Sequence, residues 1–141
     1  MDPRKLERLR ALSLLYVEDD LATREELAQI LEIWLGRVQV ASNGQEAVAA
    51  HERSRYPLIF MDCQMPEVDG FEATALIRKM EGRSAHTPIV AMTANSMQGD
   101  RERCLEAGMD DYVAKPVRPK DLQSVLDTWL GNNSTATGTT G

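Results

Sequence analysis

Short apolar segments alternate with longer amphipathic segments along the chain. The apolar segments are LSLLYV (12–17), VQVA (38–41), LIFM (58–61), PIVAMT (88–93) and YVAK (112–115). They are too short and too uniformly apolar for strands with one face in water, so they predict strands that are buried on both faces. Strands of this kind are typical of a parallel sheet.

Amphipathic segments between these strands place apolar residues at the helical spacing i, i+3, i+4 and i+7. The three clearest sets are Leu27, Ile30, Leu31 and Trp34; Ala73, Leu76, Ile77 and Met80; and Leu122, Val125, Leu126 and Trp129. Each set predicts one buried helical face. Residues that begin or end helices lie at matching places: Asn43 with Glu46 as a capping box, Pro119 at a helix start, and Gly108 and Gly131 at helix ends.

Five strands that alternate with five helices predict an α/β fold. Crossovers between parallel strands are right-handed, so we expect a single doubly wound (βα)5 sandwich with helices on both faces of a five-stranded parallel sheet. Ligands of such folds bind beyond the carboxyl ends of the strands. These ends carry Glu18, Asp19 and Asp20 after the first strand, Asp62 after the third, Thr93 after the fourth and Lys115 after the fifth. We expect these side chains to converge.

Composition limits the setting of this site. The 141 residues are 43% apolar and 27% charged, which fits one domain, and the net charge of -6 favours a metal cation or a basic partner over nucleic acid. Cys63 and Cys104 form no CxxC motif, so we expect no disulfide framework or zinc site, and Cys63 is interpreted as a small packed residue. The cytoplasm is the expected location, because the sequence shows neither a signal peptide nor an apolar run of about 18 residues.

Crowded carboxylates at one sheet edge need a counter-charge. Without a cation they would raise one another's pKa values, and hard oxygen ligands suit Mg²⁺, whose coordination shell often includes phosphate oxygens. A carboxylate can attack phosphorus when positive groups offset the developing charge. Lys115 and the Thr93 hydroxyl could hold the phosphoryl oxygens. Alone, Asp62 would be interpreted as a turn residue, but four matching strand ends favour a chemical role.

These residues give the chain a resemblance to receiver domains of two-component signalling, which have the fold of the chemotaxis response regulator. The matching motifs are YVEDD, MDCQMPEVDG, MTA and YVAKP, within about residues 11 to 130. The stretches FEATALIRKM and TANSMQGDRERCLEAGMDDYVAKP are most similar to receivers of hybrid sensor histidine kinases. The resemblance implies a flavodoxin-like sheet with strand order 2-1-3-4-5.

The resemblance also implies a metal site. Asp62 would be the phosphoacceptor, and Mg²⁺ would be held by Glu18, Asp19, Asp62 and the backbone carbonyl of Gln64. Glu18 departs from the aspartate that is common in the family, and its longer side chain suggests contact through water. Asp20 is interpreted differently, as the cap of the following helix that only adds charge to the pocket.

The remaining implied roles concern the phosphoryl group. Thr93 and Lys115 would contact it, Tyr112 would change rotamer on activation, and the bond between Lys115 and Pro116 would be cis. A plain packing role is an equally good interpretation of Tyr112. The two histidines, His51 and His86, are expected to be exposed and without a ligand role.

The implied function is Mg²⁺-dependent transfer of phosphate to Asp62 from a phosphohistidine on a histidine kinase or histidine phosphotransfer domain. The chain would then switch partner interactions or relay the phosphate. It would be a signalling domain and no enzyme beyond its own phosphorylation and dephosphorylation, without direct contact to nucleic acid or membrane.

Two alternatives remain. A pseudo-receiver would bind partners without phosphorylation, although the chemical positions are intact. A phosphatase of the haloacid dehalogenase type would need an aspartate where Gln64 stands, and nucleotide binding lacks both GxGxxG and GxxxxGK[ST]. The expected organisation is an extension or connector at 1–10, the receiver at 11–130 and a flexible tail at 131–141.

Overall fold

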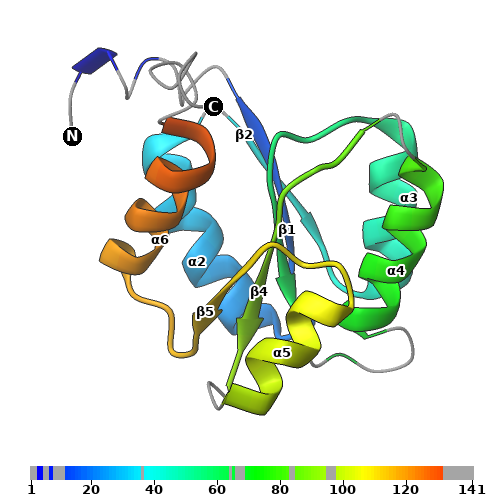
Figure 1. Ribbon diagram of the computed structural model, residues 1–141. Coiled ribbons are helices and arrows are strands. Elements are labelled where there is room, and N and C mark those ends of the chain that lie inside the picture. The colour runs from blue at the N-terminus through cyan, green and yellow to red at the C-terminus, as the bar shows by residue number, and fades with distance from the viewer. Residues whose placement is uncertain are drawn as a thin grey trace, which may run out of the picture.

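The computed structural model describes residues 3, 4, 7, 12–35, 37–63, 65, 69–82, 85–94 and 98–131. Five parallel strands form one sheet in the order β2-β1-β3-β4-β5 (Figure 1). They are β1 (Ser13–Val17), β2 (Arg37–Ala41), β3 (Ile59–Asp62), β4 (Ile89–Thr93) and β5 (Asp111–Ala114). The predicted fold class and strand order are confirmed. The predicted extension (1–10) and tail (131–141) lie mostly outside the described residues.

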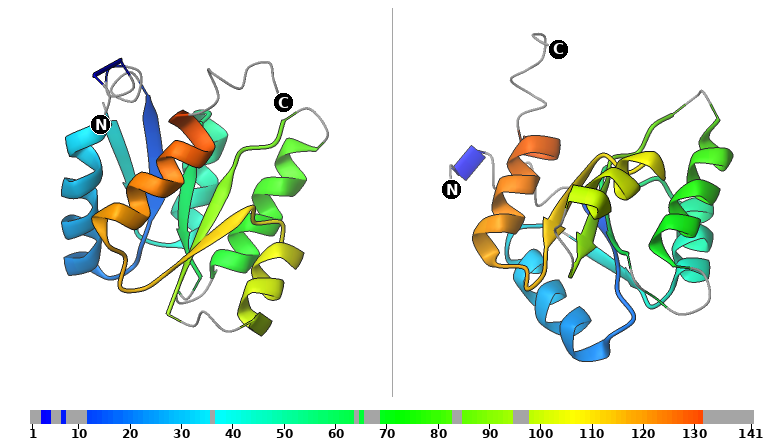
Figure 2. Two further views of the ribbon diagram at one scale, coloured as in Figure 1. Left: turned by 60° about the vertical axis from the view of Figure 1, so that its left-hand side comes forward. Right: turned by 60° about the horizontal axis from the view of Figure 1, so that its bottom comes forward.

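Helices cover both faces of the sheet (Figures 1 and 2). They are α2 (Leu21–Trp34), α3 (Gly44–Arg53), α4 (Gly70–Glu81), α5 (Gln98–Glu106) and α6 (Pro119–Leu126), which continues as the π-helical turn η1 (Asp127–Gly131). One apolar core lies between the sheet and α2, α6 and η1, and a second lies between the sheet and α3, α4 and α5. None of the helices in the described ranges is long and apolar enough to cross a membrane.

Helix starts follow the local chemistry of the sequence. The Asn43 side chain accepts from the Glu46 amide at 2.8 Å, but the Glu46 carboxylate turns to Ser42, so only half of the predicted capping box forms. Pro119 is the first residue of α6, as predicted. Gly108 adopts a φ of 103°, a backbone conformation that favours glycine.

The first residue of β1 and the last residue of η1, called the outer ends of these two elements, lie on the side of the sheet where the strands begin (Figure 1).

Predicted burial is wrong in part for both edge strands and for α4. In β5, at one edge of the sheet, Ala114 is exposed. The segment at 38–41 lies in β2, an edge strand, and Val40 is 39% exposed because only one neighbour strand covers it. On α4, Ala73 and Ile77 are buried as predicted, but Leu76 and Met80 are 45% and 41% exposed. The buried face of α4 instead includes the polar residues at 74 and 81, which shifts the apolar stripe toward solvent.

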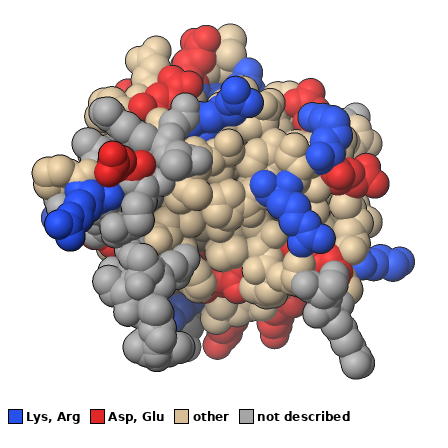
Figure 3. All heavy atoms as spheres, turned by 90° about the horizontal axis from the view of Figure 1, so that it is seen from above, with Lys and Arg blue, Asp and Glu red and all other residues tan. Residues whose placement is uncertain are grey.

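A charged network at the end of the sheet where the strands begin changes the interpretation of His51. Arg78 donates to Glu81 at 2.8 Å and to Asp110 at 2.9 Å, and Asp110 lies 2.6 Å from His86. The His51 Nε2 atom lies 3.5 Å from Glu81, and the residue is only 8% exposed. The prediction of an exposed His51 is therefore wrong, since this network buries it, whereas the His86 side chain is 59% exposed. Figure 3 shows this end of the molecule, with charged groups around a largely uncharged centre.

Candidate functional site

The carboxyl ends of the strands bring the predicted acidic residues together. Carboxylate oxygens of Glu18, Asp19 and Asp62 all lie within 4.8 Å of one another. Lys115 Nζ lies 3.1 Å from Asp62 Oδ1 and 3.4 Å from Glu18 Oε1. The side chains line an open pocket of about 520 Å³. The convergence predicted from the strand ends is therefore present for the acidic residues and Lys115, while Thr93 does not line this pocket.

Asp62 is held at the last position of β3, where it is only 2% exposed. The amide of Cys63 donates to the Met92 carbonyl at 3.0 Å, which continues the pairing with β4 past the aspartate. On the other side, the amide of Gly70 donates to the Cys63 carbonyl at 3.3 Å. A Cβ atom at Gly70 would lie 2.2 Å from the Asp62 carbonyl oxygen, so this close approach of α4 requires glycine.

Glu18 is fixed by contacts along its main chain and side chain. Arg24 Nη1 donates to the Glu18 carbonyl at 2.9 Å, and the Asp20 amide donates to Glu18 Oε2 at 3.3 Å. Asp20 itself caps α2, because its carboxylate accepts from the Thr23 amide at 2.9 Å and the Thr23 hydroxyl at 2.6 Å. These hydrogen bonds lower the pKa of Asp20. The predicted capping role of Asp20 is confirmed.

The pocket is electrostatically unbalanced. Burial raises the pKa of Glu18 to about 7, and a hydrogen bond and charge repulsion from Asp62 add to this effect. Burial alone would lower the pKa of Lys115, but the charges of Asp62 and Glu18 outweigh it and raise that pKa. One ammonium group thus faces three carboxyl groups. A further positive charge would stabilise this arrangement.

The residues present fit a magnesium ion. All three acidic side chains offer hard oxygen ligands, which Mg²⁺ prefers. Oxygen Oε1 of Glu18 is buried and has the ammonium group of Lys115 3.4 Å away, but it accepts no hydrogen bond of good geometry from the described residues, so it retains capacity for a cation. Gln64, whose backbone carbonyl is predicted to be a further ligand, lies outside the described residues.

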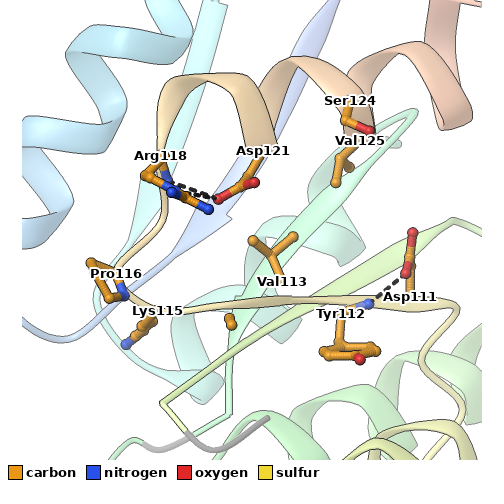
Figure 4. Close-up of a pocket in the computed structure, with 10 residues that line it drawn as sticks. Asp111, Tyr112, Val113, Lys115, Pro116, Arg118, Asp121, Ser124 and Val125 are labelled. Carbon is orange, nitrogen blue, oxygen red and sulfur yellow. Dashed lines mark hydrogen bonds and ion pairs between the residues drawn. The ribbon is translucent and has the colours of Figure 1, made fainter.

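Thr93 and Tyr112 occupy different surroundings. Thr93 ends β4 next to Met92, the partner of Asp62, and is 5% exposed, so it lies at the same sheet edge as the acidic residues. Tyr112 lines a separate groove of about 620 Å³ between β5 and α6 (Figure 4). Its ring projects from the opposite side of β5 to Val113, and the guanidinium carbon of Arg101 lies 5.7 Å from the ring centroid. The Tyr112 ring is thus available for packing contacts with α5.

Lys115 joins the groove of Tyr112 to the acidic pocket. It lines both cavities, and its amide donates to the Thr93 carbonyl at 2.8 Å. The peptide bond between Lys115 and Pro116 is cis, as the resemblance implied. The ammonium group therefore reaches Asp62 from the end of β5.

Sequence reasoning did not assign some residues around the site. Tyr16 is fully buried in β1, and burial raises its pKa well above the usual range, with added effects from the charges of Glu18 and Asp62. Its position two residues before Glu18 on a strand was an available signal, because alternate residues share a face. The sulfur atoms of Cys63 and Cys104 lie 3.8 Å apart, and nothing in their sequence spacing indicated this contact.

Comparison with known proteins identifies the family. The model of the response regulator receiver domain matches residues 14–127. The chain belongs to this family. Receiver domains are signalling domains rather than classical enzymes, so the match decides against the haloacid dehalogenase alternative.

Individual relatives agree with this assignment. Hybrid signal transduction histidine kinase B of Dictyostelium discoideum is 40% identical over an alignment of 119 residues, and the match covers 77% of this chain but only 6% of that kinase. The receiver domain of sensor histidine kinase PA1611 from Pseudomonas aeruginosa, solved with a magnesium ion in its active site cleft, is 42% identical with a TM-score of 0.76, and the match covers 85% of this chain and 98% of that one. The predicted similarity to receivers of hybrid kinases is confirmed.

A third relative was solved with a partner. The receiver domain of Ssk1 from Saccharomyces cerevisiae was co-crystallised with the histidine phosphotransfer protein Ypd1. It is 32% identical with a TM-score of 0.80, and the match covers 91% of this chain and 94% of that one.

Proposed function

We propose that this receiver domain accepts a phosphoryl group on Asp62 from a phosphohistidine of a histidine kinase or histidine phosphotransfer domain. The observation that carries the proposal is the position of the Asp62 carboxylate, 3.1 Å from Lys115 Nζ and beside the acidic pair Glu18 and Asp19. The likeness to a receiver co-crystallised with a histidine phosphotransfer protein supports this class of donor. The phosphorylated domain then switches partner interactions or passes the phosphate on.

In the proposed reaction, one carboxylate oxygen of Asp62 attacks phosphorus. A P–O bond forms, the P–N bond breaks, and the departing imidazole nitrogen keeps the electron pair. Bound by Glu18, Asp19, Asp62 and the Gln64 carbonyl, Mg²⁺ would supply positive charge against the phosphoryl oxygens. Lys115, whose side chain is 26% exposed, would turn from the carboxylates to one phosphoryl oxygen.

Other residues have supporting roles in the proposal. The buried Thr93 hydroxyl would donate to a second phosphoryl oxygen from the end of β4. Tyr112 would change its packing against α5 when Thr93 and Lys115 gain these contacts. The domain would span residues 11–130 and would catalyse no reaction beyond its own phosphorylation and dephosphorylation. It would work in the cytoplasm, and its direct partners would be proteins rather than nucleic acid or membrane.

The test uses Mg²⁺ and a small acyl phosphate donor, with intact-mass measurement. The wild-type chain should gain the mass of one phosphoryl group, and the gain should disappear with Asp62→Asn or with a chelator. Asp69→Asn, which changes the cap of α4, is the matched control and should keep the label. Labelling of Asp62→Asn at full stoichiometry would show a different acceptor, and an unlabelled wild-type chain would favour the pseudo-receiver alternative.

A further inference from the structure

The chain contains two cysteines, and the fold brings both together beside the phosphoacceptor strand. Cys63 directly follows β3, and Cys104 lies in α5, yet their sulfur atoms are 3.8 Å apart. Both residues are buried, with exposures of 3% and 1%. Each thiol therefore has a second thiol close by with which it can form a disulfide.

Helix α5 buries few side chains against the domain. Among residues 101–106 of the helix, Cys104 alone is buried, within the second apolar core, and Leu105 is 49% exposed. Two arginine–aromatic contacts add to this packing, from Arg103 to Phe71 at 4.4 Å and from Arg101 to Tyr112 at 5.7 Å. A helix with so few buried apolar groups opens locally at low free-energy cost. Opening would admit a small oxidant to thiols that the closed form shields.

We propose that Cys63 and Cys104 are a redox modification site, at which hydrogen peroxide forms a reversible disulfide that tethers α5 to the end of β3. In the opened form, one sulfur attacks the peroxide, loses its proton and becomes a sulfenic acid, and one water is released. When α5 closes again, the second thiol attacks the sulfenic sulfur. The S–S bond forms, a second water leaves, and the peroxide has accepted two electrons.

The geometry determines which part of the chain must move. A disulfide bond is about 2.05 Å long, so the two sulfurs must approach by roughly 1.8 Å. The main chain of Cys63 is fixed by two hydrogen bonds: its amide donates to the Met92 carbonyl, and its carbonyl accepts from the Gly70 amide. Movement therefore falls on α5. The disulfide would join Cys104, the one buried residue of 101–106, covalently to the end of β3 and would restrict the helix that follows Thr93.

The experiment treats the reduced wild-type chain with hydrogen peroxide under native conditions. Intact mass should show the loss of two hydrogen atoms per chain, and a thiol count in denaturant should fall from two to none, with full recovery after dithiothreitol. Hydrogen exchange of the α5 amides should slow in the oxidised chain. Cys63→Ser and Cys104→Ser should each gain oxygen at the remaining thiol or dimerise, without the loss of two hydrogens in a monomer.

Three results would overturn the proposal. The first is stable sulfinic acid on both thiols of the wild-type chain, because a neighbouring thiol should resolve the sulfenic acid first. The second is an intermolecular disulfide as the main product. The third is unchanged amide exchange of α5 after the internal disulfide has formed, which would show that no tether of the helix results. All three are read on the wild-type chain, so the result does not depend on whether the serine variants fold, and none depends on phosphorylation.

Discussion

Gly70→Ala tests how α4 begins against the end of β3, the strand that ends at Asp62. The new Cβ atom would lie 2.2 Å from the carbonyl oxygen of Asp62 and 3.0 Å from the Cα atom of Cys63. All of these neighbours belong to the main chain, so no side-chain rotation can relieve the collision. Either the first turn of α4 or the peptide unit after Asp62 must move.

The expected magnitude follows from two opposing effects. An alanine in place of glycine stabilises a helix by up to about 1 kcal/mol. Ordinary contact begins near 3.4 Å, so the Cβ atom is too close by more than 1 Å, and overpacking of this kind costs about 1–3 kcal/mol or more. We expect Gly70→Ala to lose about 2 kcal/mol of unfolding free energy. The collision outweighs the helix propensity because the main chain cannot yield without breaking its pairing with β4.

Two measurements make up the assay: urea denaturation gives the unfolding free energy, and labelling by an acyl phosphate gives the rate of phosphorylation. Gly82→Ala is the matched control: its φ of 58° also costs an alanine about 1–3 kcal/mol, but none of the described residues has an atom within 4 Å of the new Cβ atom. Gly82 is twelve residues further along, about 18 Å from Gly70 at the helical rise. Gly70→Ala should slow phosphorylation of Asp62, whereas Gly82→Ala should lose stability alone. A Gly70→Ala chain with wild-type stability and wild-type phosphorylation would refute the close approach.

Two further outcomes are expected. Asp19→Ala should weaken Mg²⁺ binding in a fluorescence or calorimetric titration more than Asp20→Ala, which removes a helix cap and should mainly lower stability; the reverse order would place the metal elsewhere. The buried His51 has a lowered pKa, chiefly through burial, so the unfolded state gains its proton first as the pH falls through about 6.5. Stability measured by urea titration should therefore decrease below that pH, and His51→Gln should reduce the decrease; an identical pH profile in both chains would contradict this effect.

The fold was predictable because the apolar segments match strands covered by helices on both faces. The edge strands β2 and β5 are the exceptions in burial, since their apolar residues, such as Val38 and Val40, look the same in sequence as those of a central strand. Periodicity also placed the apolar stripe of α4 on the core side, although Leu76 and Met80 face solvent. Burial in these elements is decided by which strands and helices pack against them in the tertiary structure. The local sequence pattern does not contain this information.

The acidic pocket was predictable because strand ends of one parallel sheet meet at one edge. Asp62 and Lys115 come from different strands, yet topology alone brings them to 3.1 Å. The contact of Cys63 with Cys104 and the burial of His51 were not predictable, because both depend on how a helix rotates against its neighbours. If α5 were rotated about its axis by one residue position, about 100°, Cys104 would no longer face Cys63. The spacing of residues in the sequence does not determine this rotation.

The position of the outer ends of β1 and η1 has a consequence for longer proteins that contain such a domain. Figure 1 shows both ends on the side where the strands begin, and the acidic pocket lies at the opposite, carboxyl ends of the strands. Segments that continue from β1 or η1 therefore start on the side remote from Asp62. A longer protein can be connected to the domain at either end without its linkers crossing the acidic pocket.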